Sequence, residues 1–284
     1  MSITQISDGE YDEFRAFLEQ VSGIVLGESK QYLVRGRLQR LLDEGGFLSL
    51  GQLSAALRSE TSLDLRTRVI DAMTTNETSW FRDELPYDYL YHVILPELTR
   101  EGDGKLRIWS AGCSSGEEPY SIGIVVQEFL EKNPGSFSAV KIVATDISSQ
   151  IINRASAGLY EESSLSRGLA NAGRAKYFSP VETRWAINPK IRDLVDFRQH
   201  NLLQSFTSFG QFNVVFCRNV LFYFSRVKRL DIVERVVTTI KPNGFLVLGS
   251  AETIDHGSLP LARSKRSPAG MVYRRTGDTG EYPS

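Results

Sequence analysis

The sequence has few cysteines, no long apolar run and no excess of charge of either sign. Cys113 and Cys217 are its only two cysteines, a usage that fits a reducing compartment better than a secreted disulfide framework. Every apolar run is too short to cross a bilayer, and the first residues lack the pattern of a secretory leader. We therefore expect a cytoplasmic protein with free thiols and no insertion into a membrane.

The charge balance also lacks the signature of a nucleic-acid-binding chain. Lysine and arginine number 33 against 34 acids, for a formal net charge of -1. A protein that neutralises many phosphates normally carries a basic excess, so no nucleic-acid partner is expected. Any basic surface for a partner must therefore be local.

Two types of region divide the 284 residues. Residues 8–78 carry apolar side chains at helical spacing, which predicts an all-helical N-terminal domain over residues 1–78. From residue 105 short β-rich runs alternate with helical ones, which predicts a mostly parallel sheet covered on both faces within residues 79–284. Glycines and prolines interrupt this rhythm over about residues 158–197, which we interpret as an insertion.

The alternation gives specific element boundaries. The predicted strands are residues 106–109, 140–145, 212–217 and 245–249. The predicted helices are residues 119–132, 148–157 and 226–240, the last of them closed by the turn-like sequence Lys241-Pro242-Asn243-Gly244. Sheets of this class bind ligands at the carboxyl ends of their strands.

A glycine-containing corner follows the first predicted strand. Gly112 and Gly116 allow a close backbone approach to a ligand, but their spacing is not G-x-G-x-x-G, and no P-loop motif occurs in the chain. Glu117 and Glu118 then open the helix, where they would repel a phosphate and suit a cationic ligand with ribose hydroxyls, such as S-adenosylmethionine. A tight strand-to-helix link with acidic caps is an equally good interpretation of this corner alone.

A second acid, Asp146, ends the next predicted strand. Acids at this place commonly bind ribose or adenine in nucleotide-binding α/β folds. Asp146 could equally cap the helix that begins near Ser148. Together with Glu118 it favours an adenosine-containing ligand.

Three ordered segments give a more specific indication. They are Asn76-Glu77-Thr78-Ser79-Trp80-Phe81-Arg82, Ser115-Gly116-Glu117-Glu118-Pro119-Tyr120-Ser121-Ile122, and Cys217-Arg218-Asn219-Val220-Leu221-Phe222-Tyr223-Phe224. Together they resemble the hallmark segments of the chemotaxis receptor glutamate methyltransferases, the CheR type. The resemblance extends over nearly the whole chain, through Lys241–Gly244 to Ser250-Ala251-Glu252.

The resemblance implies a helical domain followed by a Rossmann-like S-adenosylmethionine domain with a small β insertion. It also implies a monomer without a metal that converts S-adenosylmethionine to S-adenosylhomocysteine and methylates glutamates on the cytoplasmic helical bundle of chemotaxis receptors. The family's cofactor contacts fall on Asn76, Thr78, Arg82, Glu118, Asp146, Asn201, Leu202, Arg218 and Asn219. Arg82 and Tyr223 would lie beside the transferred methyl group.

The implied reaction needs alignment more than acid–base chemistry. A glutamate with a pKa of about 4.3 is already ionised at neutral pH, so no general base is required. The planar guanidinium of Arg82 can orient the carboxylate, and Tyr223 can donate a further hydrogen bond. The competing interpretations are an interdomain salt bridge for Arg82 and a core aromatic for Tyr223.

Residues 30–40 carry four positive charges and no acid. Arg37 and Arg40 should share a helix face beside an apolar stripe, so Arg35, Arg37 and Arg40 could dock an acidic receptor helix. A solvated charged face without a partner remains the alternative.

Two further points concern specificity. Members of the family that bind a peptide at the receptor's C-terminus have a longer loop in the β insertion, whereas only 16 residues separate Tyr177-Phe178 from Val195-Asp196-Phe197 here, which predicts no docking of that peptide. The alternative functions are methylation of another protein carboxylate or small acid, a cofactor-binding signalling scaffold without turnover, and, with least support, an NAD-linked dehydrogenase.

Overall fold

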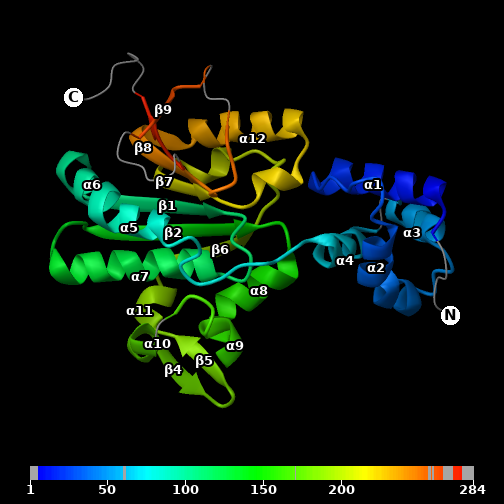
Figure 1. The fold of residues 1–284 in the computed structure, drawn as a ribbon, viewed down its shortest axis with the longest axis horizontal. Coiled ribbons are helices and arrows are strands. Elements are labelled where there is room, and N and C mark those ends of the chain that lie inside the picture. Colours follow the sequence, from blue (N-terminus) through cyan, green and yellow to red (C-terminus); the bar gives the residue numbers. More distant parts are fainter. Residues whose placement is uncertain are drawn as a thin grey trace.

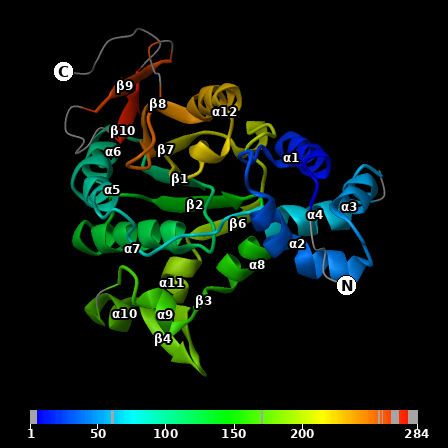
Figure 2. The same ribbon diagram turned by 45° about the vertical axis from the view of Figure 1, so that its right-hand side comes forward.

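The fold is described from a computed structural model that places residues 6–59, 62–169, 171–254, 257, 259–264 and 271–276. Within these ranges a helical domain lies against the end of an α/β domain at which the parallel strands terminate (Figures 1 and 2). None of the described helices is long and apolar enough to span a bilayer.

The N-terminal part is all-helical, as predicted. Its helices are α1 (Asp8–Ser22), α2 (Gln31–Gly45), α3 (Leu50–Leu57) and α4 (Leu63–Met73). A capping box starts α1, where the Ser7 hydroxyl accepts from the Glu10 amide and the Glu10 carboxylate accepts from the Ser7 amide. Apolar residues at helical spacing, among them Phe14, Leu38 and Leu53, form one buried core between the helices.

The second part is built on a seven-stranded sheet of order β6-β2-β1-β7-β8-β10-β9. Its strands are β1 (Lys105–Ala111), β2 (Ala139–Asp146), β6 (Val195–Gln199), β7 (Phe212–Cys217), β8 (Ile240–Leu248), β9 (Leu261–Arg263) and β10 (Val272–Arg275). All pairs from β6 to β8 are parallel, and β10 runs antiparallel to both β8 and β9. The strand order reverses between β1 and β7, and ligands of parallel α/β sheets bind beside such a switch point.

Helices cover both faces of this sheet, which confirms the predicted α/β class. Along β1, Ile108 contributes to the core on the face covered by the helices between Leu85 and Lys132. Trp109 contributes to the core on the opposite face, which α12 (Arg226–Thr238) covers. This alternation is the period of two expected for a strand buried on both faces. The helical elements of this part are α5 (Leu85–Tyr89), η1 (Leu90–Ile94), α6 (Leu95–Glu101), α7 (Glu117–Lys132), α8 (Ser149–Ala157), η2 (Thr207–Phe209), η3 (Leu221–Tyr223) and α12 (Arg226–Thr238).

A small antiparallel sheet of order β3-β5-β4 is inserted after α8. Its elements are β3 (Leu159–Tyr160), α9 (Glu162–Leu165), α10 (Asn171–Tyr177), β4 (Phe178–Val181), β5 (Arg184–Ile187) and α11 (Pro189–Arg192). The expected end of the insertion at residue 197 needs correction, because β6 pairs in parallel with β2 in the main sheet. The hairpin that the insertion does contain joins β4 to β5 through Glu182 and Thr183 alone.

One turn expected from the sequence is absent. Residues 241–244 do not close the preceding helix, because α12 ends at Thr238 and these residues lie within β8. A register irregularity between Phe212 and Val214 in the partner strand accommodates them, and Asn243 adopts a positive φ of 63°. Proline and glycine therefore indicate an irregular strand here and not a turn.

Hydrogen bonds join the helical domain to the carboxyl end of the sheet. The Val25 amide donates to the Tyr223 carbonyl oxygen at 2.8 Å, and the Asn201 side chain donates to the Val21 carbonyl oxygen at 2.8 Å. The Lys228 ammonium donates to the Glu19 carbonyl oxygen at 2.6 Å. These bonds hold the end of α1 and the α1–α2 loop against the carboxyl end of the sheet (Figure 2).

Candidate active site

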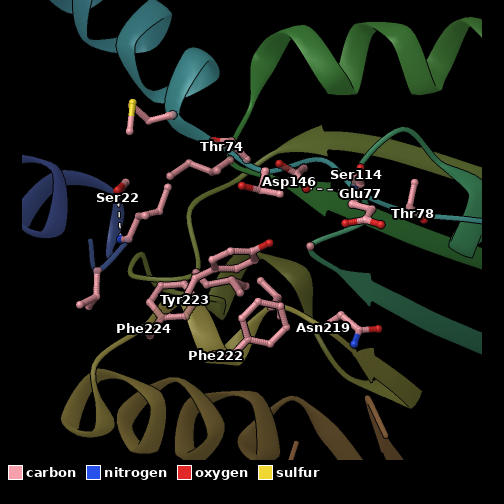
Figure 3. A pocket seen from close by; sticks show the side chains of 18 of the residues that line it. Ser22, Thr74, Glu77, Thr78, Ser114, Asp146, Asn219, Phe222, Tyr223 and Phe224 are labelled. Carbon is pink, nitrogen blue, oxygen red and sulfur yellow. Dashed lines mark hydrogen bonds between the residues drawn. The ribbon is translucent and has the colours of Figure 1, made fainter. Parts of the chain in front are cut away.

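A cavity of about 310 Å³ lies where the two domains meet. Its walls are the α1–α2 loop, the linker after α4, the ends of β1, β2 and β6, and the loop after β7. Figure 3 shows side chains from these elements converging on one space. The position at the switch point between β1 and β7 is the one predicted for the ligand.

The corner after β1 depends on two glycines. Gly112 has a φ of 79°, and a Cβ added to it would lie 2.9 Å from Cγ2 of Val220. The amides of Gly112 and Cys113 both donate to the Thr145 carbonyl oxygen, so the end of β1 is tied to the end of β2. Gly116 caps α7 with a φ of 94° and no side-chain cap. Gly112 therefore presents its backbone to the cavity, whereas Gly116 packs against Tyr160, Ala155 and Phe197 and does not line it.

The two acids that open α7 face different surroundings. Glu117 lies away from the cavity and accepts hydrogen bonds from the hydroxyls of Ser115 and Ser164. Glu118 lines the cavity, accepts from the Ser110 hydroxyl at 2.8 Å and pairs with Arg218 at 3.2 Å. Burial raises the pKa of the Glu118 carboxyl, and the nearby Arg218 partly offsets this. Only the second acid is available to a ligand.

Asp146 lines the cavity beside this corner and does not cap α8. Its carboxylate accepts from the amides of Ser114 at 2.9 Å and Ser148 at 3.0 Å, while the Ser148 hydroxyl caps the helix. Burial raises the pKa of Asp146, and the two backbone donors counteract it. Asp146 therefore shapes the corner and also presents an acceptor to the cavity (Figure 3).

Arg218 links three parts of the site. Its side chain is 1% exposed and pairs with both Glu118 and Asp83. One Nη also donates to the Arg82 carbonyl oxygen at 2.8 Å. Its Nε is buried without a hydrogen-bond partner among the described residues, and Arg218 lines the cavity. Asn219, the next residue, also lines the cavity and has a positive φ of 56°.

Arg82 comes from the segment that crosses between the domains. Its guanidinium donates to the Glu77 carbonyl oxygen at 3.3 Å, and within the described ranges it forms no ion pair. The interdomain salt bridge considered for it is therefore absent from this part of the chain. Thr78 lines the cavity with it, whereas Asn76 does not, although the Asn76 Oδ1 atom is buried without a described partner.

Tyr223 projects its hydroxyl into the cavity (Figure 3). Tyr223 is half-buried, whereas its neighbours Leu221 and Phe224 are buried in the core, so Tyr223 is not a core aromatic. Burial raises the pKa of this phenol, so at neutral pH the hydroxyl keeps its proton and can donate it in a hydrogen bond.

Asn201 and Leu202 follow β6 and line the same cavity. The Asn201 side-chain amide donates to the Val21 carbonyl oxygen, and its Oδ1 accepts from the Leu203 amide at 2.9 Å. Asn201 therefore also holds the two domains together.

The three arginines predicted to dock a partner differ in exposure and in their contacts. Arg35 is exposed, and Arg40 has 89% of its side chain exposed while it pairs with Glu44. Arg37 instead donates to the Met73 carbonyl oxygen at 2.6 Å and the Thr75 hydroxyl at 2.8 Å, and it lines the cavity. Arg37 and Arg40 are three residues apart on α2 and so share a helix face, but the Arg37 guanidinium is hydrogen-bonded to the linker, and a role for it in docking stays a prediction.

The two cysteines are buried free thiols, as predicted. Burial raises the pKa of both thiols well above its ordinary value. No group of three or more metal-ligating side chains occurs among the residues that the structure places.

Both parts of the chain match known families. Residues 9–74 match the family described as "CheR methyltransferase, all-alpha domain", and residues 76–267 match "CheR methyltransferase, SAM binding domain". The chain is 45% identical to chemotaxis protein methyltransferase Cher2 of Pseudomonas putida over 268 residues, which cover 93% of this chain and 97% of the relative. It is 45% identical to chemotaxis protein methyltransferase 1 of Pseudomonas aeruginosa, covering 94% and 98%. Identity to the chemotaxis protein methyltransferase of Escherichia coli is 32%, covering 88% and 86%.

Proposed function

The chain belongs to the CheR family of chemotaxis methyltransferases, and on that premise we propose which of its residues carry out the reaction. It is an S-adenosylmethionine-dependent protein-glutamate methyltransferase that acts on chemotaxis receptors. The observation that carries the assignment of residues is the convergence of Arg82, Glu118, Asp146 and Tyr223 on one cavity at the strand switch point.

The polar groups of the cavity fit S-adenosylmethionine. Two buried donors, the Nε of Arg218 and the hydroxyl of Ser114, lack a partner among the described residues and belong to residues that line the cavity. Buried donors in this situation are normally satisfied by a ligand or by water. Glu118 and Asp146 add carboxylate acceptors that suit ribose hydroxyls and a positively charged ligand.

When bound, S-adenosylmethionine supplies a methyl group on a positively charged sulfur. The protein's task is to align a glutamate oxygen with it and to exclude water. Arg82 has no described ion-pair partner and can hold the incoming carboxylate in its planar fork. Tyr223 can donate a hydrogen bond from its protonated hydroxyl to the same group. Thr78, Asn201, Leu202, Arg218 and Asn219 line the cavity and would bind the cofactor. Asn76, which the resemblance also assigns to the cofactor, does not line the cavity.

One chain suffices for this site, because residues of both domains line the cavity. We assign receptor docking to the helical domain, with Arg35 and Arg40 on the exposed side of α2 and Arg37 bracing the linker. The acidic helical bundle of a receptor is the partner that such a cationic face suits.

The short hairpin of the insertion supports independence from a receptor tail peptide. The β4–β5 connection consists of Glu182 and Thr183, which leaves no extended loop beside the edge of the small sheet. The expected result of a titration with the receptor's terminal residues is no measurable binding.

Receptor-containing membranes incubated with S-adenosylmethionine labelled in its methyl group test the assignment. The label should be transferred to the receptor and released as methanol by mild base, which distinguishes a carboxyl methyl ester from a methylamine. Binding of S-adenosylhomocysteine without any base-labile product would favour a scaffold over an enzyme.

A further inference from the structure

The carboxylate of Glu252 lies under the loop that follows β7. The side chain is buried, and its two oxygens accept four backbone hydrogen bonds. Oε2 accepts from the amides of Asn219 at 2.7 Å and Gly249 at 2.9 Å. Oε1 accepts from the amides of Val220 at 3.0 Å and Leu221 at 2.8 Å. Glu252 thereby fixes three consecutive residues of the loop.

Three consecutive amides that converge on one point form an anion-binding nest. The positive φ of Asn219, 56°, turns the loop so that these amides point the same way. The anion that fills this nest is a carboxylate of the chain itself. Hydrogen bonds to an ionised acceptor are stronger than neutral ones, so this nest holds the loop in one conformation.

The turn after β8 is fitted closely against the same loop. A Cβ added to Gly249 would lie 2.8 Å from Oε2 of Glu252 and 2.9 Å from Nδ2 of Asn219. The Glu252 amide donates to the Gly249 carbonyl oxygen at 3.0 Å, which closes the turn. The turn at Gly249 and the loop at Asn219 are therefore closely packed against each other, which leaves little room for the loop to shift.

The fixed amides lead directly to the proposed catalytic tyrosine. Helix η3 starts at Leu221, and the Tyr223 amide donates to the Val220 carbonyl oxygen at 3.2 Å. Val220 in turn lies against Gly112 at the corner after β1. The position of the Tyr223 hydroxyl thus depends on the segment that Glu252 anchors, although Glu252 does not line the cavity.

We propose that Glu252 is a positioning residue for methyl transfer, which acts through the amides of residues 219–221 to hold Tyr223 at the cavity. The proposal rests on the function assigned to Tyr223 above. It does not require any contact between Glu252 and the cofactor or the receptor.

Replacement of Glu252 by glutamine tests this role, because glutamine keeps the shape but turns an NH₂ group toward donors. Turnover at saturating cofactor and receptor should fall on the order of 10- to 100-fold, since small misplacements of an aligning group have effects of that size. In a Tyr223→Phe background the same replacement should lower turnover by less than about threefold, because the group it positions is already gone. The exposed Glu234 on α12 provides the matched control, Glu234→Gln, which should change nothing.

Two results would overturn the proposal. One is turnover of folded Glu252→Gln within about twofold of wild type, and the other is an equal loss with and without the Tyr223 hydroxyl, which a purely structural role would give. If the glutamine variant does not fold, Glu252→Asp, which keeps the charge on a shorter side chain, takes its place under the same criteria.

A readout without catalysis separates this proposal from the function itself. Amide hydrogen exchange of residues 219–221 in the complex with S-adenosylhomocysteine should accelerate at least tenfold in Glu252→Gln and remain unchanged in Glu234→Gln. Unchanged exchange at these amides in Glu252→Gln would refute the proposal that Glu252 anchors residues 219–221. If exchange accelerates in Glu252→Gln but the wild-type protein methylates no receptor, the anchoring by Glu252 is supported and the proposed function is rejected.

Discussion

The guanidinium of Arg218 and the carboxylate of Glu118 form a buried ion pair with an Nη1–Oε2 distance of 3.2 Å. The pair joins the loop after β7 to the first turn of α7, across the point where the strand order reverses. Arg218 also reaches Asp83 in the segment that carries Arg82, at 2.8 Å. Since Arg218 also donates to the Arg82 carbonyl oxygen, one cation connects all three segments on which the family resemblance rests.

Replacement of Arg82 by alanine should affect turnover more than cofactor binding. Loss of the carboxylate-orienting group should lower turnover on the order of 100-fold or more, whereas the dissociation constant of S-adenosylhomocysteine should change by about threefold or less. Steady-state kinetics and calorimetry measure the two quantities. The exposed Arg100 on α6 is the control site, and unchanged turnover in Arg82→Ala would remove Arg82 from the mechanism.

The raised pKa of Glu118 predicts a particular dependence of stability on pH. An ordinary glutamate titrates near 4.5, and burial raises the pKa of Glu118 above that value in the folded protein. Between these two values the folded protein holds a proton that the unfolded chain has released, so this carboxyl makes the unfolding free energy fall as pH rises.

Replacement of Glu118 by glutamine removes this pH-dependent contribution to the free energy of unfolding. The stability of wild type relative to Glu118→Gln should therefore fall over the pH window that begins at about 4.5, as measured by urea denaturation at several pH values. A relative stability that rises with pH over this window would mean that Arg218 lowers the Glu118 pKa by more than burial raises it.

Gly112 and Gly135 form a matched pair for testing the backbone corner. Both have positive φ angles, 79° and 82°, but a Cβ on Gly135 would meet nothing within 4 Å, whereas one on Gly112 would approach Val220 at 2.9 Å. Each alanine replacement should cost about 1–3 kcal/mol of stability for the backbone conformation. Only Gly112→Ala should also weaken S-adenosylhomocysteine binding, by about tenfold or more; equal affinities in the two variants would contradict a close backbone approach at Gly112.

Receptor docking by the exposed arginines of α2 predicts a dependence on salt. Charge reversal at Arg35 and Arg40 should raise the apparent Michaelis constant for receptor at low ionic strength and flatten its increase with salt, with turnover at saturation unchanged. Reversal of the exposed Arg184 in β5 is the control. If the Michaelis constant changes neither with salt nor on charge reversal at Arg35 and Arg40, these arginines do not dock the receptor and are simply solvated.

Features contained in one stretch of sequence were predictable. The Gly112 corner, the acid at Glu118 and the acid that ends β2 all follow from residue types next to a strand end. The helical spacing of residues such as Phe14 and Leu18 was sufficient to predict the N-terminal domain, which the structure confirms.

Features that depend on distant partners were not predictable. Arg37 has the sequence context of a surface cation, but its partners, Met73 and Thr75, are over 30 residues away. Residues 195–197 belong to the main sheet because they pair with β2, a partner about 50 residues earlier that no local pattern indicates. The role of Glu252 does not follow from the sequence, because its four donors come together only in the folded chain.

A crystal structure of the complex with S-adenosylhomocysteine tests the central claim most directly. The account predicts the adenosyl group between Glu118 and Asp146, with the sulfur directed toward the Arg82 guanidinium and the Tyr223 hydroxyl. A sulfur that points away from both side chains, or a ligand bound outside the interdomain cavity, would contradict it.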